Sequence, residues 1–513
     1  MPKMKRLAII SSIFFLFTGC EEFLEEEIKN KYVSESWYQT ESQAEASLTG
    51  LYGLVRDIYG SANATDFVWG TIGTDICYSI QTEMAYFANY DYDATNSTVY
   101  STYKNHYRII NQANSVMART TDMIVDEQIL EGAKKRIIGE AKFLRALCYW
   151  NLVRIYGDVP LKLDETSSAE GLDIPKTSAS IIYDSIVADL LDAEVLMPDN
   201  KESGRANKYA AAALLGKVYL QMTGPPVNND TYYGNAVEKL QMVIDSNYYE
   251  LLSDYADIFN LDNEGHEEAI FTCAYASSEV GSNQGNQLVR FFGVAGSFTN
   301  GGCHPHYKVF IDEFVSLYDT ADNRFDQNVN TVEVLNNQGV TIPLENKIIS
   351  EGTILAWNVK KWSKPIGIEP TFAETQSPYD WIVLRYADVL LMYAEALNGF
   401  YGAPTPEAYD AVNQVRLRAG LEELDSGLSG EAFLNAVLNE RVLELCYESS
   451  RKADLYRNGK LDAVVRSIPE DGYYQDIKVT GAAHYDPKRG PFWPLPQSAI
   501  DINHALEQNP AYE

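Results

Sequence analysis

The sequence predicts a mainly α-helical protein in which paired helices stack into an array and a long irregular insertion with short strands interrupts that array. Two observations predict this fold class. Apolar residues recur at steps of three and four through most of the 513-residue chain, which is typical of helices that bury one face. The stretch from about 248 to 379 lacks this period and carries Gly/Asn-rich runs and short β-branched segments instead.

The most clearly marked helix begins near Ile137 and ends before Gly157. Its apolar residues form one stripe: Ile137, Ala141, Leu144, Cys148 and Leu152. The helix is expected to end there because Pro160 has no amide hydrogen to donate and disfavours helical geometry in the residue before it. Further helices are predicted over 42–59 and 103–119. The stretch 61–101 between them is rich in aromatic, Asp and Asn residues and shows no sustained period, so we expect an irregular segment with functional content.

A repeat signal follows in 204–246. Leu215-Gly216-x-x-Tyr219 fits one step of a tetratricopeptide helix, and 232–246 is its expected partner. Three more pairs are predicted: 134–156 with 178–196, 380–397 with 406–419, and 430–447 with 450–466. We therefore expect degenerate tetratricopeptide-like helix pairs over about 134–247 and 380–466, each stabilised by its neighbours.

Composition sets limits on function. Acidic residues outnumber basic ones by 72 to 41, which gives a net charge of −31. Such a surface favours solubility and repels phosphate backbones, so nucleic acid is not an expected partner. The six cysteines show no CxxC or zinc spacing, and Cys148 and Cys446 lie in apolar helical stripes, where we expect small core residues.

The first twenty residues predict export. Lys3, Lys5 and Arg6 precede an apolar run, Leu7 to Phe17, that is too short to span a bilayer. Thr18-Gly19-Cys20 then resembles a lipobox, so 1–19 is predicted to be a lipoprotein signal peptide and Cys20 the lipidated residue. The alternative is an ordinary signal peptide with an incidental cysteine.

Motifs for catalysis and metal binding are weak. No nucleophile-elbow, Walker or dinucleotide-binding pattern occurs, and no acidic pair stands out, so we predict no catalytic residues, no cofactor and no metal. Cys303-His304-Pro305-His306 has no second ligand group at zinc spacing, and a histidine that stacks or hydrogen-bonds is expected there. Asp91 and Asp93 begin like a calcium loop, but Asn96 stands where glycine is required.

Charged residues of the later helices are expected to form ion pairs between helices: Arg385, Arg416, Arg418, Glu440, Arg441, Glu444 and Arg451.

Several segments resemble, in kind and order, those of the SusD/RagB family of outer-membrane nutrient-binding lipoproteins: RALCYWNLVRIYGDVPL, GRANKYAAAALLGKVYL, WIVLRYADVLLMYAEALN, ERVLELCYESSRKADLYRNGKL and FWPLPQSAIDINHALEQNPAYE. The resemblance spans most of the predicted mature body, 20–513. It implies a lipid-anchored protein at the outer face of the outer membrane. It also implies a SusC-like TonB-dependent transporter as partner, over which the protein acts as a lid, and a nutrient that is most often a glycan.

The ligand site is expected on the irregular segments 61–101 and 248–379. A sugar presents apolar C–H faces and hydroxyl edges, so a site needs aromatic platforms with polar side chains around them. On that composition the candidate ligand-binding residues for an oligosaccharide or polysaccharide are Trp69, Tyr86, Asn89, Tyr90 and Trp357. Three alternatives stay open: a peptide ligand, to which the NQGNQ run points, a surface glycoside hydrolase, and a scaffold without a small ligand.

Overall fold

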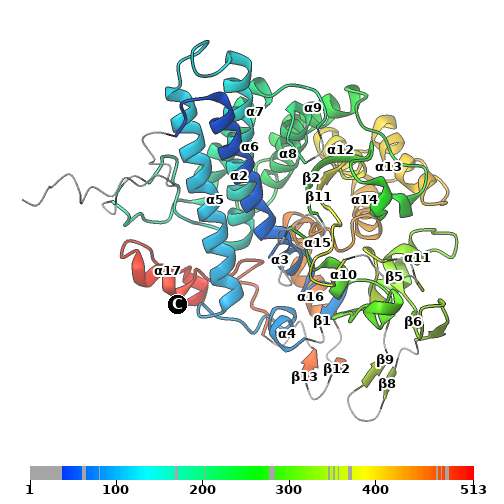
Figure 1. The fold of residues 1–513 in the computed structure, drawn as a ribbon. Coiled ribbons are helices and arrows are strands. Elements are labelled where there is room, and N and C mark those ends of the chain that lie inside the picture. The colour runs from blue at the N-terminus through cyan, green and yellow to red at the C-terminus, as the bar shows by residue number, and fades with distance from the viewer. Residues whose placement is uncertain are drawn as a thin grey trace, which may run out of the picture.

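The computed structural model describes residues 37–60, 65–79, 81–166, 168, 171–202, 204–276, 284–344, 347–349, 353–355, 357–364, 366–367, 372–468, 472–474, 477–479 and 484–513. The predicted signal peptide and Cys20 lie outside these residues. The fold is mainly helical, as predicted, with short strands gathered in the insertion (Figure 1).

Six long helices build the first part of the array: α2 (Glu41–Tyr59), α5 (Ser97–Asp122), α6 (Glu131–Tyr156), α7 (Ala179–Leu196), α8 (Lys208–Met222) and α9 (Tyr232–Asp245). In Figure 1, α2, α5, α6 and α7 lie side by side, and α8 and α9 continue the stack toward the second half of the chain. The predicted pairing of α6 with α7, and of α8 with α9, is confirmed by their contacts. Long amphipathic segments pair in this way because each buries its apolar face only against a neighbour.

Helix α6 lies at the centre of this stack. The sequence predicted one buried stripe, but the helix is buried on nearly every side from Ile137 to Tyr156, since α5 and α7 pack on opposite faces. Gly139 permits the close approach of α7, because a Cβ there would lie 2.9 Å from Leu196 Cβ. Gly157 ends the helix with φ +73, a conformation that favours glycine.

The second part of the array contains α12 (Tyr386–Tyr401), α13 (Pro406–Arg418), α14 (Gly430–Glu444), α15 (Arg451–Arg457), α16 (Leu461–Ser467) and, near the C-terminus, α17 (Gln497–Ile502). Helix α12 packs against α13 as predicted, and also against α9 and α14, which joins the two parts. The helix predicted from 380 begins only at Tyr386, because the preceding five residues form a strand. The single helix predicted over 450–466 is two short helices, divided at Gly459, where φ is +65.

The insertion contributes most of the strands. A four-stranded antiparallel sheet has the order β1 (Cys77–Ser79), β4 (Tyr307–Val309), β10 (Asn358–Val359), β5 (Val329–Asn330). Strand β2 (Ala269–Cys273), one of the short strands expected in the insertion, pairs with β11 (Trp381–Arg385). Smaller sheets join β3 (Ala295–Gly296), β6 (Val332–Val334) and β7 (Thr341–Pro343), then β8 (Lys347–Ile349) with β9 (Thr353–Leu355), and β12 (Gly472–Tyr474) with β13 (Ile477–Val479). Two one-turn helices, α10 (Leu288–Phe291) and α11 (Phe325–Asn328), complete the insertion.

The segment 61–101 is more ordered than predicted. It contains α3 (Thr65–Thr71), strand β1 and α4 (Thr82–Ala88) before α5 begins. Each of these helices has seven residues, so its apolar period repeats too few times to be recognised in the sequence.

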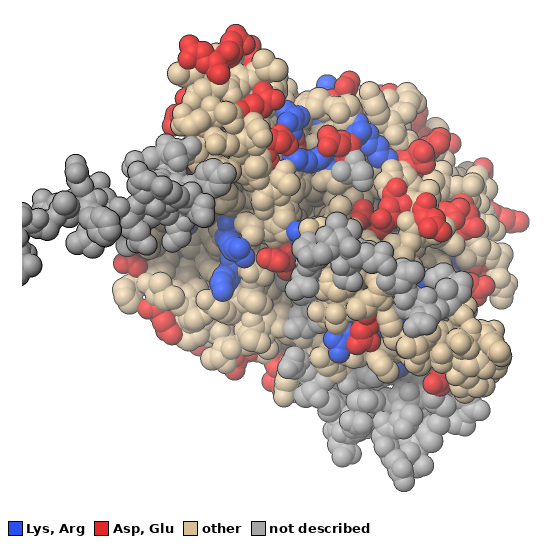
Figure 2. Space-filling view, viewed as in Figure 1, with Lys and Arg blue, Asp and Glu red and all other residues tan. Residues whose placement is uncertain are grey.

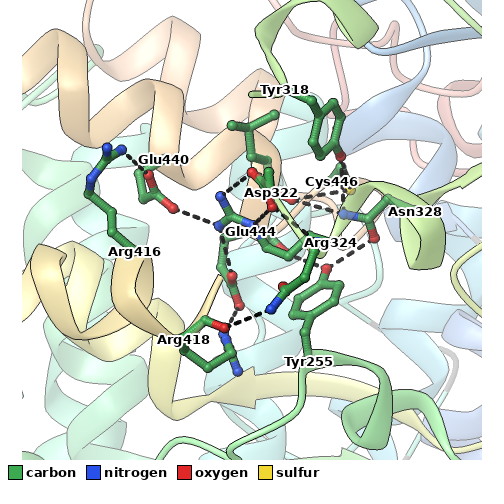
Figure 3. A network of polar contacts seen from close by, with 12 residues as sticks. Tyr255, Tyr318, Asp322, Arg324, Asn328, Arg416, Arg418, Glu440, Glu444 and Cys446 are labelled. Carbon is green, nitrogen blue, oxygen red and sulfur yellow. Dashed lines mark hydrogen bonds and ion pairs between the residues drawn. The ribbon is translucent and has the colours of Figure 1, made fainter. Parts of the chain in front are cut away.

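A buried network of ion pairs joins the insertion to the array, and it includes ion pairs between the neighbouring helices α13 and α14, as predicted. Arg324 of the insertion pairs with Glu440 at 2.6 Å and with Glu444 at 3.1 Å (Figure 3). Arg418 of α13 also pairs with Glu444, at 2.5 Å, and Arg416 pairs with Glu440 at 3.0 Å. Because these side chains come from the insertion, α13 and α14, the network fixes the insertion against the repeat helices.

None of the helices in the described ranges is long and apolar enough to cross a membrane.

Candidate functional site

The four-stranded sheet brings the two irregular segments together. Strand β1 belongs to 61–101, whereas β4 and β10 belong to the insertion, and the register pairs Cys77 with Val309 and Ser79 with Tyr307. Helix α4 follows β1 and contacts it. Residues separated by more than 200 positions in the sequence therefore lie side by side in one sheet.

Three of the five predicted ligand residues retain exposed surface. Tyr86 of α4 is 44% exposed, and Asn89, which follows the last turn of α4, is half-buried. Trp357 is half-buried just before β10, and its indole N–H donates to the carbonyl oxygen of Leu344 at 3.2 Å. Trp357 is joined to the β1 side through the sheet, because its carbonyl accepts the amide hydrogen of Val309 at 3.2 Å.

The other two predicted residues are buried, which corrects their assignment to a ligand surface. Trp69 is 1% exposed, its indole N–H donates to Pro491 O at 3.0 Å, and the guanidinium of Arg154 lies 5.0 Å from its ring centre. Tyr90 is 4% exposed, and its hydroxyl donates to Gly73 O at 2.7 Å. Other protein groups cover both rings, so in this structure they stabilise packing and offer no face to a sugar.

A histidine that was not among the predicted ligand residues lies beside the start of α4. His306 Nδ1 lies 2.9 Å from Gln81 Oε1, and its ring packs 4.4 Å from the ring centre of Phe291. The expectation that a histidine in the 303–306 run would stack or hydrogen-bond is confirmed. Burial, and then the positive charge of Arg290, lower the pKa of His306 to about 4. The imidazole is therefore neutral at pH 7, and with Nδ1–H donated to Gln81 its Nε2 can accept a hydrogen bond.

Arg290 adds a cation to this surface. Its Nε lies 3.6 Å from Glu374 Oε1, and both side chains are about one-third exposed. We call the surface defined by Gln81, Tyr86, Asn89, Arg290 and His306 the insertion face. It offers one exposed aromatic ring together with amide, imidazole and guanidinium groups, which is the mixture that hydroxyl-rich ligands use.

Acidic side chains outnumber basic ones on the face shown in Figure 2. Figure 2 shows acidic side chains spread over the visible face, where the fewer Lys and Arg side chains lie mostly beside acidic ones. A cavity of about 790 Å³ lies between α13 and α14, with Asp319, Glu422, Glu423 and Asp425 in its lining. It contains none of the predicted ligand residues.

Metal and thiol chemistry find no support in the described part of the chain. No group of three His, Cys, Asp or Glu residues there is placed to hold a metal ion. Cys303 is buried, and burial raises the pKa of its thiol to about 12, so it remains protonated at pH 7. Cys148 and Cys446 are buried core residues, as predicted.

Two family models match the chain. One, described as the SusD family, matches residues 267–512. The other, described as starch-binding associating with outer membrane, matches residues 22–220. Together they cover most of the chain.

Known proteins similar to the chain carry the same family name. SusD-like protein P25 of Formosa agariphila is 28% identical over 99% of both chains. The starch-binding protein SusD of Bacteroides thetaiotaomicron is 24% identical over 79% of this chain and 77% of that protein.

Solved structures agree in fold. A SusD homologue from Bacteroides thetaiotaomicron superposes with a TM-score of 0.81 at 24% identity, covering 93% of this chain and 98% of that one. A laminarin-binding SusD-like protein superposes with a TM-score of 0.75 at 23% identity, covering 93% and 100% of the two chains. The matched models, the relatives and the shared helical fold lead to one conclusion: the protein belongs to the SusD/RagB family.

Proposed function

We propose that the protein is a cell-surface lipoprotein that captures a glycan at the insertion face and delivers it to a TonB-dependent outer-membrane transporter. The single observation that carries the ligand part is the meeting of the two irregular segments at the β1–β4 pair. Tyr86 is exposed on α4, and Gln81 at the start of that helix contacts His306 of the insertion. Family relatives that are named for binding starch and laminarin support a glycan as the ligand class.

Binding without turnover is the expected activity. Glu374, the carboxylate beside Arg290 on the insertion face, is held as an ion-pair partner at 3.6 Å. A glycosidase needs two carboxyl groups that flank the bond to be cleaved, one of them free to donate a proton. The arrangement of this surface supports a role in capture, and the protein is proposed to have no catalytic residues.

The peptide alternative receives less support. The NQGNQ run was its hint, and Asn286 within that run is fully buried, with its amide donating to Tyr379 O. Its backbone also pairs with Ser377. A buried asparagine that satisfies the protein's own backbone is not available to read the backbone of a bound peptide.

The test is retention of the protein lacking residues 1–20 on a panel of plant, fungal and host polysaccharides, with a peptide digest included and product analysis on the same samples. We expect selective retention by one glycan with no released product. Retention by peptides alone, or release of sugar product, would contradict the proposal.

Delivery requires a partner. We expect the lipidated protein to co-purify with a SusC-like transporter from outer membranes, because the family resemblance implies a lid over such a transporter. Extraction in mild detergent, followed by mass spectrometry of the co-purified proteins, measures this. Recovery of the protein without any TonB-dependent transporter would contradict this part of the proposal.

A further inference from the structure

A second concave site lies away from the insertion face, between the first helices and the C-terminal segment. A cavity of about 440 Å³ is bounded by the end of α6, the start of α7 and residues 488–512. In Figure 1 this is the region of α17 and the C-terminal label, on the opposite side of α4 from the insertion strands. A buried aromatic cluster that includes Phe87 and Trp493, 4.8 Å apart, lies between α4 and this cavity.

The cavity has apolar walls. Phe492 and Tyr512 are half-buried side chains in its lining, together with Pro226 and Pro510. The hydroxyl of Tyr512 donates to Phe492 O at 2.6 Å, and burial raises the pKa of this phenol to about 12. Tyr512 is therefore neutral and its polar end is already satisfied, so its ring serves the cavity as an apolar surface. Flat apolar walls of this kind suit the C–H face of a sugar ring.

Two cations stand at the same cavity. The Arg489 guanidinium lies 4.6 Å from the Tyr512 ring centre, and its Nε donates only a long hydrogen bond, 3.4 Å, to Ala511 O. Lys488 is exposed beside it. Within the described residues, no carboxylate lies within 4.0 Å of either cation. Asp486 accepts the backbone N–H of Lys488 at 3.0 Å and does not pair with its ammonium group.

An arginine without a carboxylate partner contrasts with the buried arginines of this protein. With a net charge of −31, carboxylates are plentiful, and buried arginines such as Arg324, Arg385 and Arg441 each pair with more than one of them. A guanidinium over an aromatic ring in a cavity, without a carboxylate partner, keeps its fork of donors for an external anion. Asp158, also in the lining, accepts Ala179 N–H through Oδ1 at 2.8 Å, which leaves Oδ2 to accept from a ligand hydroxyl.

We propose that this cavity is a second ligand site that binds a sugar residue carrying an anionic group, either a carboxylate or a sulfate ester. The ring packs against Phe492 and Tyr512, the anionic group meets Arg489 and Lys488, and a hydroxyl donates to Asp158. The volume suits one or two sugar rings. The site is built from residues outside the insertion face, so it does not depend on what that face binds.

Saturation-transfer NMR on the protein lacking residues 1–20, with any tag at its amino end, tests the proposal. The probes are glucuronic acid, galactose 6-sulfate and glucose. We expect a saturable signal from at least one acidic sugar, a much weaker one from glucose, and loss of signal as salt is raised, because an exposed charge contact is screened. A preference between the first two probes distinguishes a carboxylate ligand from a sulfate ester.

Variants locate the site. Arg489→Gln is expected to weaken binding of the acidic sugar about tenfold, since a hydrogen-bonded charge is lost. Lys488→Gln, on an exposed side chain whose loss leaves folding intact, is expected to weaken it severalfold. Arg108→Gln is the matched control, because it removes one exposed positive charge from α5, outside the cavity. Tyr86→Ala is expected to leave the acidic-sugar signal unchanged, which separates this site from the insertion face.

Three outcomes would overturn the proposal: no signal from either acidic sugar, equal signals from acidic and neutral sugars, or wild-type binding by both Arg489→Gln and Lys488→Gln.

Discussion

At the residue scale, the carboxylate of Glu444 forms ion pairs with three arginines. Its side chain is fully buried, and Arg324, Arg385 and Arg418 all lie within 3.1 Å of its carboxylate oxygens. These cations hold the pKa of Glu444 well below its ordinary value of 4.5, against the opposing effect of burial. A buried charge network of this kind is costly to break, because one lost partner leaves the others uncompensated.

Glu444→Gln is therefore expected to lower the free energy of unfolding at pH 7 by about 3–5 kcal/mol. Thermal unfolding of wild type and variant measures it. Since the folded-state pKa is depressed, the wild-type advantage is complete above about pH 4.5 and declines as pH falls below that value. The control is Glu431→Gln on the exposed start of the same helix, which should cost no more than about 1 kcal/mol. Equal unfolding temperatures for the two variants would contradict the network's role.

Lys452, unlike Glu444, is a buried ionisable side chain without an ion-pair partner among the described residues. It is 2% exposed, its ammonium lies 5.1 Å from the Tyr90 ring centre, and no carboxylate among the described residues pairs with it. Burial lowers its pKa from 10.5 to about 7. Keeping this amine protonated in the folded state is unfavourable, so the group destabilises the fold most at and below pH 7.

We expect Lys452→Met to raise the free energy of unfolding at pH 7 by about 1–3 kcal/mol. The gain should shrink as pH rises from 7 toward 10.5, because the lysine of the unfolded chain then loses its proton too. Denaturant unfolding of both proteins across this pH range measures it, with Lys135→Met, on an exposed side chain, as the control. A gain that is independent of pH would contradict the assignment to charge burial.

Individual ligand residues were the hardest feature to predict. Composition placed Tyr86 in the same candidate set as Trp69 and Tyr90 and could not separate the exposed Tyr86 from these two buried rings. The bounds of helix α4, which the sequence did not reveal, are needed to separate exposed from buried residues here. Once its bounds are known, Met84 and Phe87 define a buried side three residues apart, and Tyr86 falls on the other side. A stacking or hydrogen-bonding histidine was expected in the 303–306 run, but its partner could not be predicted, because Gln81 lies 225 positions away from His306.

At the scale of secondary-structure elements, glycines determine how closely neighbouring helices approach one another. A Cβ on Gly216 of α8 would lie 2.7 Å from Leu240 of α9, whereas a Cβ on Gly50 of α2 would meet nothing within 4 Å. Both positions are inside helices, where alanine is favoured over glycine by about 0.5–1 kcal/mol. Packing against the partner helix therefore determines which substitution is tolerated.

Gly50→Ala is expected to stabilise the protein by about 0.5–1 kcal/mol, and Gly216→Ala to destabilise it by about 1–3 kcal/mol through overpacking. Paired thermal melts measure the difference, and each variant serves as the other's control for helix propensity. Stabilisation by both substitutions would show that α8 and α9 are packed less tightly than the structure indicates.

Element prediction succeeded where segments were long and failed where they were short. The helices of 14 residues or more in the first part of the array could be predicted because the apolar stripe repeats several times. Strand β11 was missed because its first four residues, 381–384, are a continuous apolar run close to the start of α12, and such a run fits either a buried strand or a helix. Its partner, β2, lies more than 100 residues earlier, so only tertiary pairing decides its conformation.

At the scale of the whole molecule, the membrane anchor stays a prediction. We propose that a lipid attaches this acidic helical body, whose net charge is −31, to the outer membrane. Cys20 is the residue predicted to carry that lipid.

Cys20→Ser is expected to release the protein from the outer membrane fraction and abolish its labelling by a fatty acid in a host that processes lipoproteins. Thr18→Ser, which keeps the cysteine and the glycine before it, should remain anchored. Fractionation with fatty-acid labelling measures both variants. Continued labelling of the serine variant would contradict lipidation at Cys20.

The central claim is that the insertion face binds the glycan, and calorimetric titration of the glycan selected in the retention panel tests it most directly. Two exposed tyrosines provide a matched comparison: Tyr86 on the insertion face, 44% exposed, and Tyr401 at the end of α12, 63% exposed. We predict that Tyr86→Ala weakens binding about tenfold without lowering the unfolding temperature, and that Tyr401→Ala binds as wild type does. Unchanged affinity in Tyr86→Ala, or a loss confined to Tyr401→Ala, would contradict the claim.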